Sequence, residues 1–188
     1  SNWVFNEVCA NIKQWKAQNR QELQVSINTS PSHYFNLESN ITQWLNLLLD
    51  QKISARSILL EVTENLLMEA NEMVSKKLFQ FRQAGVDIAL DDFGTGYSSI
   101  SYLKRFPTDF IKIDRSFVKS MTDVSNDKVL CEAIIVMANK LGIKVVAEGV
   151  ETQEQYDILK SMGCDYAQGY FIAKPLSKSD FESFWEKH

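Results

Sequence analysis

The chain has 188 residues, which is enough for one domain with a sizeable core. Its formal net charge is −4, so no basic surface for long nucleic acid is expected, and its two histidines are too few for a histidine-rich metal site. Three cysteines without close pairing suit a reducing cytosol, and the longest apolar run, 133–138, is too short to cross a bilayer.

Short apolar runs alternate with segments of helical spacing along the whole chain. Apolar residues from Phe5 to Trp15 recur at helical spacing and predict an opening helix. Further helices are predicted at 41–49, about 71–84, near Ser98, about 126–141, at 153–162 and after Ser177. Strands are predicted to end at or near Asn28, Glu61, Asp91, Lys112–Asp114, Glu148 and Gln168. This alternation is typical of a parallel sheet in an α/β fold.

The alternation of polar and apolar side chains along each run favours a barrel over an open doubly wound sheet. Glu61 shares one face of its strand with Leu59 and Thr63, while Leu60 and Val62 share the other. The same phase puts Asp114 on the face of Lys112. An aliphatic outer face with polar groups at the strand ends is what a TIM-like (βα) barrel requires, whereas an open sheet needs two apolar faces.

The polar groups at these strand ends are mostly carboxylates and amides. Oxygen ligands without His or Cys suit Mg²⁺ or Mn²⁺, and the adjacent Asp91 and Asp92 can serve two ions. A two-metal site suits phosphodiester hydrolysis, in which Lys112 could hold the nucleophilic water and Glu148 could be a base or a ligand. A lone Asp-Asp pair would usually be two solvated carboxylates at the start of a loop. Here the polar residues at the strand ends all lie on the same face of their strands, which argues against that interpretation.

Five linked motifs, in order along the chain, closely resemble the EAL domain. They are Leu60–Glu64, Asp91–Ser99, Lys112–Asp114, Ala147–Glu151 and Gln168–Tyr170. That family comprises bacterial phosphodiesterases that open cyclic di-GMP to linear pGpG. The resemblance runs from about Trp3 to the end, so residues 1–188 are predicted to be a single EAL-type domain, with about six βα units of the family's modified barrel.

The resemblance implies a role for each matching residue. Asn28, Glu61 and Asp91 resemble ligands of the first metal, and Asp91 with Asp92 would bind the second. Lys112 resembles the lysine that holds the catalytic water. The remaining matches are Glu148 as base or second-metal ligand, Gln168 beside the metal water, Glu64 anchoring the 92–99 loop, and Asp114, Glu151 and Tyr170 as structural or ligand contacts.

One departure from the family pattern affects the expected activity. The Glu-Ala-Leu strand, which supplies a metal-binding glutamate, precedes the family's equivalent of Trp3 and is absent here, so the domain is predicted to be truncated at its N-terminus. A metal site without one acidic ligand binds metal weakly. The chain alone is therefore expected to be weakly active or inactive, and its parent to be a cyclic di-GMP phosphodiesterase.

Two other functions and several partners follow from the same resemblance. A catalytically inactive domain that binds cyclic di-GMP is the first alternative, and a protein-interaction module is the second. An exposed sheet edge and the family's loop-mediated dimers favour a homodimer. A cytoplasmic bacterial location without membrane contact by the domain is expected, in a parent that can be membrane-tethered or fused to sensory or cyclase domains.

Overall fold

The structure is a computed structural model that describes residues 2–18, 23–35, 41–96, 103, 105–121 and 125–187. Within these ranges the strands follow one another in the sheet as they do in the sequence, in the order β1-β2-β3-β4-β5-β6. The contacts between Cα atoms divide the chain into two compact units, Ser1–Lys112 and Ile113–His188. The first unit contains β1 to β3 and nearly all of β4, and the second contains β5 and β6.

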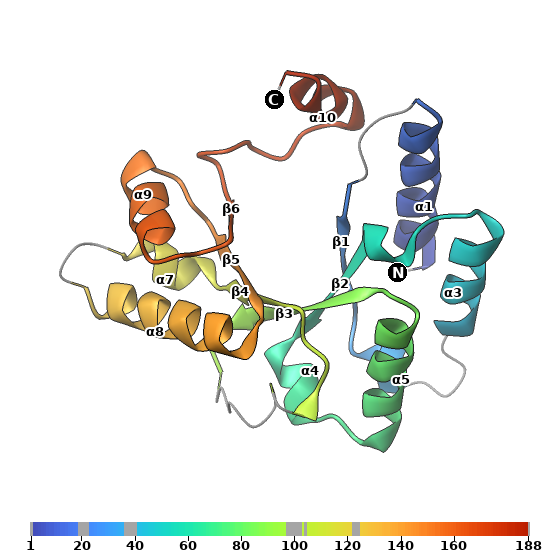
Figure 1. Ribbon diagram of the computed structural model, residues 1–188, viewed down its shortest axis with the longest axis horizontal. Helices are drawn as coiled ribbons and strands as arrows, with labels where there is room; N and C mark the ends of the chain where they lie inside the picture. The colour runs from blue at the N-terminus through green and yellow to red at the C-terminus, as the bar shows by residue number, and fades with distance from the viewer. Residues whose placement is uncertain are drawn as a thin grey trace. The chain divides into compact units, whose positions relative to one another are not determined.

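In the first unit β1 pairs with β2 and β2 pairs with β3 in parallel, and helices pack beside these strands. The strands are β1 (Val25–Asn28), β2 (Ile58–Thr63), β3 (Asp87–Phe93) and β4 (Phe110–Ile113). The helices are α1 (Asn2–Ala17), α2 (Ser32–Phe35), α3 (Ile41–Asp50), η1 (Ala55–Ser57), α4 (Glu64–Met68) and α5 (Glu72–Gln83). Figure 1 shows α3 and α5 beside each other, next to the strands of this unit.

Apolar spacing and caps explain these helices. Helix α1 buries Phe5, Cys9 and Ile12, which fall on one face at helical spacing. Helix α5 begins where the Asn71 side chain accepts a hydrogen bond from Val74 N at 3.0 Å, a typical N-cap. It ends at Gln83, and Gly85, two residues further on, has a φ of 91° that suits glycine.

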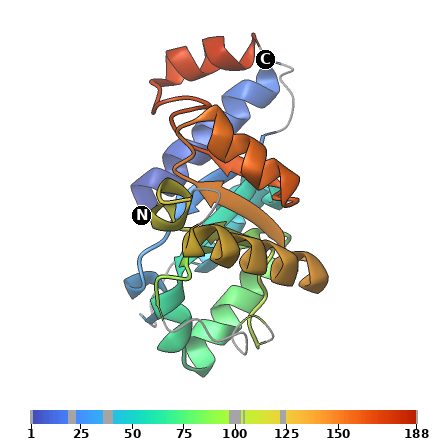
Figure 2. The same cartoon turned by 90° about the vertical axis from the view of Figure 1, so that its left-hand side faces the viewer.

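The second unit places three of its helices on one side of β5 (Figure 1). The strands are β5 (Lys144–Glu148) and β6 (Tyr166–Gln168), which pair in parallel. The helices are α7 (Arg115–Lys119), α8 (Asn126–Leu141), α9 (Gln153–Ser161) and α10 (Lys178–Trp185). Figure 1 shows α7, α8 and α9 on one side of β5, and Figure 2, seen from that side, shows α8 and α9 in front of it.

The predicted strands and long helices are confirmed, and the 3-10 helix η1 and three short α-helices were not predicted. The three α-helices are α2, α4 and α7, of four or five residues each. So short a segment has too few residues to display a helical period. The helix predicted near Ser98 starts outside the described residues.

One detail of the fourth strand is corrected. Asp114 was expected to share a strand face with Lys112, but β4 ends at Ile113. Asp114 instead caps α7, because its carboxylate accepts a hydrogen bond from Ser116 N at 2.9 Å. A side chain that caps a helix in this way stops the strand before it.

No helix in the described ranges has the length and apolar character needed to span a membrane.

Candidate active site

The carboxyl ends of the strands in the first unit bring together several of the predicted site residues. Asn28 is the last residue of β1 and lies opposite Glu61 of β2 in the parallel register. Asp91 of β3 lies opposite Thr63, the last residue of β2. In a parallel sheet these ends all face the same edge, where sites form.

Three charged side chains form a buried cluster at this edge. The Nζ of Lys112 lies 2.9 Å from Glu61 Oε1 and 3.0 Å from Asp91 Oδ1. The side chains of Lys112 and Glu61 are only 6% and 4% exposed, and that of Asp91 is 13% exposed. One ammonium group thus contacts two carboxylates and offsets part of the repulsion between them.

Asp92 follows directly and has an unusual backbone. Its φ is 54°, in the left-handed region that most residues avoid. The side chain is exposed, and one of its carboxylate oxygens lies within 4.8 Å of a carboxylate oxygen of Asp91. Strained backbone of this kind is typical of functional sites, and here it coincides with a second acidic group next to the buried cluster.

Glu64 reaches from the start of α4 to the segment that follows β3. Its carboxylate is buried, and Gly94 N donates to Glu64 Oε2 at 3.4 Å. A Cβ atom on Gly96 would lie 3.0 Å from Glu64 Oε1, so the backbone passes close to this carboxylate. Gly94 and Gly96 of the 92–99 loop thus lie close to Glu64, and the anchoring role of Glu64 stays a prediction. Tyr97, Ser98 and Ser99 lie outside the described residues.

Glu148 and Gln168 end the two strands of the second unit. They lie opposite each other in the parallel register of β5 and β6. Val150 N donates to Gln168 O at 3.0 Å, and Phe171 N donates to Val150 O at 3.0 Å, so the two strand ends are joined by backbone hydrogen bonds. A Cβ atom at position 169 would lie 2.1 Å from Val150 O, and Gly169 avoids this overlap because glycine has no Cβ atom.

The other predicted residues of this unit lie around these strand ends. Asp114 caps α7. Burial raises the pKa of its carboxyl, but the hydrogen bonds from Ser116 and Arg115 and the positive charge of Arg115 together outweigh it and leave the pKa below its usual value. Glu151 is exposed, and its backbone N–H donates to Gln155 Oε1 at 2.7 Å. Tyr170 is exposed, with the Lys174 ammonium 5.7 Å from the centre of its ring.

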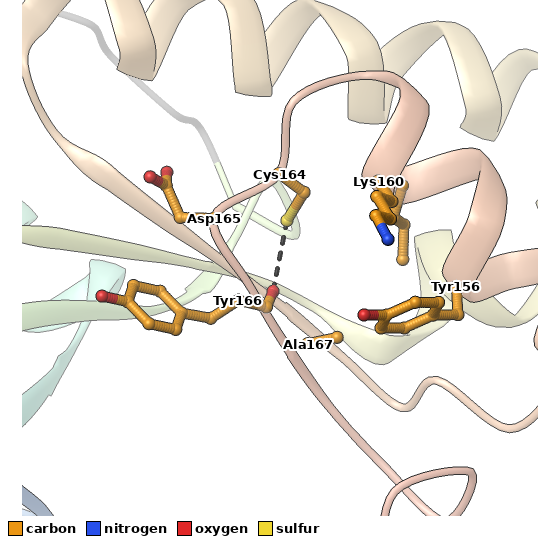
Figure 3. Close-up of a pocket in the computed structure, with 7 residues that line it drawn as sticks. Tyr156, Lys160, Cys164, Asp165, Tyr166 and Ala167 are labelled. Atoms are coloured by element: carbon orange, nitrogen blue, oxygen red, sulfur yellow. Dashed lines mark hydrogen bonds between the residues drawn. The ribbon is translucent and has the colours of Figure 1, made fainter.

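A pocket of about 220 Å³ in the second unit lies away from these residues. It is lined by residues of α9 and of the segment that enters β6, namely Tyr156, Leu159, Lys160, Cys164, Asp165, Tyr166 and Ala167 (Figure 3). The pocket lies at the start of β6, whereas Gln168 lies at its end. None of the predicted site residues lines it.

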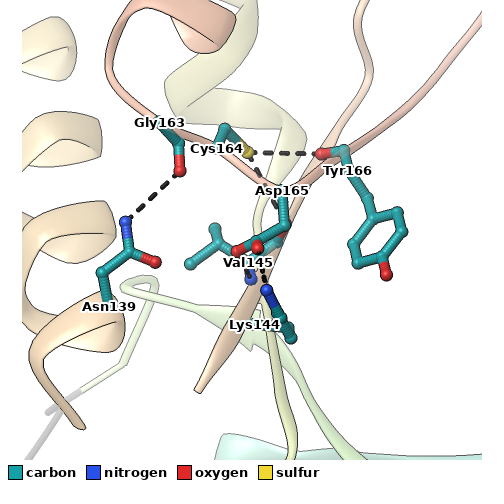
Figure 4. A network of polar contacts seen from close by, with 7 residues as sticks. All are labelled: Asn139, Lys144, Val145, Gly163, Cys164, Asp165 and Tyr166. Atoms are coloured by element: carbon teal, nitrogen blue, oxygen red, sulfur yellow. Dashed lines mark hydrogen bonds and ion pairs between the residues drawn. The ribbon is translucent and has the colours of Figure 1, made fainter. Parts of the chain in front are cut away.

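A polar network beside this pocket is structural. Asp165 Oδ2 accepts from Val145 N at 3.0 Å, and its other oxygen pairs with Lys144 (Figure 4). The thiol of Cys164 donates to Tyr166 O at 3.2 Å. Burial raises the pKa of this thiol to about 11, so it stays protonated and unreactive at neutral pH. These bonds fix the starts of β5 and β6.

The strand-end pattern does not single out Thr29, although the structure places it at the same edge. Thr29 follows Asn28 directly and is buried. Its N–H donates to Glu61 O at 3.1 Å, which continues the pairing of β1 with β2 by one residue. The only signal in the sequence is a polar residue next to a predicted ligand.

A family model described as EAL domain matches residues 1–175. The chain belongs to the EAL domain family. The solved structure described as "PaMucR Phosphodiesterase, c-di-GMP complex" has a TM-score of 0.87 and 33% identity, over 95% of this chain and 72% of that one. The predicted fold class, an α/β barrel of the EAL type, is confirmed by this match.

Two further similar proteins concern function and metal. Cyclic di-GMP phosphodiesterase NbdA of Pseudomonas aeruginosa is 37% identical over 97% of this chain, which spans 23% of that protein. A Klebsiella pneumoniae BlrP1 structure is described as a manganese/cy-diGMP complex; it has a TM-score of 0.79 and 31% identity, over 91% of this chain and 44% of that one. The chain thus spans about a quarter of the length of the first curated relatives.

Proposed function

We propose that this EAL domain takes part in the metal-dependent hydrolysis of cyclic di-GMP to linear pGpG. The family match and the phosphodiesterase activity named for relatives such as NbdA support this function. Because the chain spans only part of those relatives, the proposal concerns the protein to which the domain belongs. The predicted partner is therefore cyclic di-GMP and not a long nucleic acid.

The observation that supports it most directly is the buried cluster of Glu61, Lys112 and Asp91. Two carboxylates and an ammonium group at 2.9 and 3.0 Å are costly to bury, and packing alone does not require them. Their place at the carboxyl ends of parallel strands is where chemistry occurs in this class of fold.

The ligand atoms at this edge fit hard divalent cations. The predicted donors are carboxylate and amide oxygens, without sulfur or imidazole, and this donor set suits Mg²⁺ or Mn²⁺. Asp91 and Asp92 offer carboxylate oxygens within 4.8 Å of each other, which is compatible with neighbouring ions. The BlrP1 structure described as a manganese complex supports the same class of metal.

We assign roles as the family resemblance implies. Asn28, Glu61 and Asp91 would hold one ion, and Asp91 with Asp92 the other. A bound pair of such ions supplies activation of water and stabilisation of charge on the phosphate. Lys112 would orient the attacking water, and the contacts of its ammonium with Glu61 and Asp91 keep it at the strand ends.

The second unit would contribute the remaining groups. Glu148 would accept a proton from the water or complete the second metal site, and Gln168 would hydrogen-bond the metal water. Their shared register and the backbone bonds through Val150 keep these two side chains as neighbours. Asp114, Glu151 and Tyr170 stay candidates for structural or nucleotide contacts.

The test is hydrolysis of cyclic di-GMP with Mn²⁺ or Mg²⁺ and protein in excess over nucleotide, followed by chromatography of the product. We expect linear pGpG to form, and Asp91→Asn to abolish its formation. Glu132→Gln, a change of the same kind on the exposed face of α8, should leave the rate unchanged. Loss of activity in both variants would refute the assignment of Asp91, and tight binding without turnover would assign a regulatory binding function instead.

For this chain alone we expect slow turnover. Its 188 residues contain no Glu-Ala-Leu segment, so the first metal site would have one carboxylate fewer than the family pattern. A rate equal to that of a longer protein that includes such a segment would contradict this expectation. The homodimer and the cytoplasmic location also remain predictions, and light scattering of the purified chain would test the first.

A further inference from the structure

A chain of buried hydrogen bonds links Tyr34 to the backbone of Glu61. The Thr29 hydroxyl donates to Glu61 O at 2.7 Å, and Tyr34 Oη lies 2.9 Å from Thr29 Oγ1. Thr29 is 7% exposed and Tyr34 is 1% exposed, so water does not compete for these bonds. All of these residues belong to the first unit.

The number of available protons fixes the direction of the chain. A carbonyl oxygen can only accept, so the single hydroxyl proton of Thr29 is used in the bond to Glu61 O. The bond between Tyr34 and Thr29 must therefore use the phenol proton of Tyr34. Burial raises the pKa of Tyr34 to about 12, which keeps this proton in place at neutral pH.

Tyr34 is itself held by a buried lysine. The ammonium of Lys77, on α5, donates to Tyr34 O at 2.9 Å and lies 3.4 Å from His33 O. Lys77 is 8% exposed, and such a group is rarely buried unless its charge is hydrogen-bonded. The short helix α2, which contains Tyr34, is thereby fixed to α5.

These bonds converge on the edge that is proposed to bind metal. The carbonyl of Glu61 accepts both the N–H and the hydroxyl of Thr29, and the side chain of Glu61 contacts Lys112 within the buried cluster. Thr29 is also the next residue after Asn28, so one residue adjoins two proposed ligands. Groups that orient metal ligands from behind commonly change metal affinity when they are removed.

We propose that Thr29 is a positioning residue, held by Tyr34, which sets the orientation of Asn28 and Glu61 for metal binding. This inference rests on the proposed function. Tyr34 acts only through Thr29, because its hydroxyl contacts Thr29 and not Glu61. Neither residue would touch the metal or the nucleotide.

The test is binding of Mn²⁺ to the metal-free chain, by titration calorimetry, alongside urea denaturation. We expect Thr29→Val to weaken the affinity about tenfold, and Thr29→Ser, which keeps the hydroxyl, to stay close to the unmodified chain. Tyr34→Phe alone should weaken binding less. When it is added to Thr29→Val, Tyr34→Phe should cause no further loss of affinity, because Tyr34 is proposed to act through the Thr29 hydroxyl.

A matched control separates positioning from general stability. Ser57 has a buried hydroxyl just before β2, at the opposite end from Thr63. Ser57→Ala should therefore leave the Mn²⁺ affinity unchanged, whatever it does to stability. If Thr29→Val binds Mn²⁺ as the unmodified chain does, or if Ser57→Ala loses as much affinity, the inference is overturned. Absence of binding by the unmodified chain would instead overturn the proposed metal site, and this inference with it.

Discussion

Lys112 is the residue on which the buried cluster depends most. Its ammonium lies within 3.0 Å of both Glu61 and Asp91, in a place with little access to water. Removing one partner of a buried ionic group leaves the opposite charges without compensation. The stability of the metal-free protein and its response to cations should therefore both change when this lysine is replaced.

We expect Lys112→Met to lower the free energy of unfolding by about 3–5 kcal/mol in the presence of a chelator. Mn²⁺ should recover part of that loss, because a divalent cation can take over the neutralisation of the two carboxylates. Urea denaturation with and without Mn²⁺ measures both effects. Lys140→Met, on the exposed end of α8, is the control and should change little. A loss that Mn²⁺ leaves untouched would argue against a metal site here.

Substitutions at Asp92 distinguish the energetic cost of its backbone conformation from the role of its carboxylate. Its φ of 54° suits glycine better than aspartate. We expect Asp92→Gly to change stability by no more than about 1 kcal/mol, and in the stabilising direction, while it weakens Mn²⁺ binding. Asp92→Asn should weaken binding as well, since asparagine tolerates this backbone but lacks the charge. Thermal denaturation and calorimetry of both variants measure the two effects, and unchanged binding in both would remove Asp92 from the ligand set.

At the scale of elements, backbone hydrogen bonds through Val150 hold the ends of β5 and β6 together. Gly169 passes so close to Val150 that any side chain would overlap its backbone, at 2.1 Å from Val150 O. The hydrogen bonds of Val150 with Gln168 and Phe171 depend on this approach. The relative position of Glu148 and Gln168 therefore depends on a glycine that has no chemical role.

We expect Gly169→Ala to destabilise the protein by more than about 2 kcal/mol, because the overlap is with backbone atoms that cannot rotate away. Gly142→Ala is the matched control: its φ is 72°, and a Cβ atom there would meet nothing within 4 Å. It should cost only about 1 kcal/mol, from the left-handed backbone alone. Equal losses in the two variants, measured by urea denaturation, would contradict the role assigned to the close approach.

The strand ends were predictable from sequence, and their neighbours across the sheet were not. Apolar runs before Glu61, Asp91 and Glu148 place each within the last three residues of a strand. Register, however, depends on contacts between strands. In the structure Asp91 lies opposite Thr63 and not Glu61, and this offset accompanies the contact of Lys112 with both acids. The contact between Thr29 and Tyr34 is likewise not predictable from sequence, because it depends on how α2 folds back after β1.

At the scale of the whole molecule, several acidic groups are buried in their protonated form. Burial raises the pKa of Cys9 to about 11 and that of Cys131 to about 12. Burial likewise raises the pKa of Tyr34 to about 12. Each group keeps its proton more tightly in the folded state than in the unfolded state, so each contribution is complete at neutral pH and is lost as the pH rises.

We therefore expect the free energy of unfolding to fall steadily as the pH rises from about 9 to about 12. Tyr34→Phe should remove the contribution of Tyr34 to that fall above about pH 10, a difference on the order of 2 kcal/mol, and leave the contribution of the buried thiols. Tyr170→Phe, at an exposed tyrosine, should follow the unmodified chain. Urea denaturation across this pH range is the measurement, and a parallel curve for Tyr34→Phe would contradict the buried phenol.

The lysine in the acidic cluster has one more consequence. The Lys112 ammonium neutralises part of the charge on Glu61 and Asp91. This edge of the sheet can therefore form where magnesium or manganese is scarce. Any ion that arrives must then compete with an internal cation that is covalently tethered. Occupancy of the proposed metal site would then rise only when free divalent ions are plentiful, and the proposed hydrolysis of cyclic di-GMP would follow the supply of these ions.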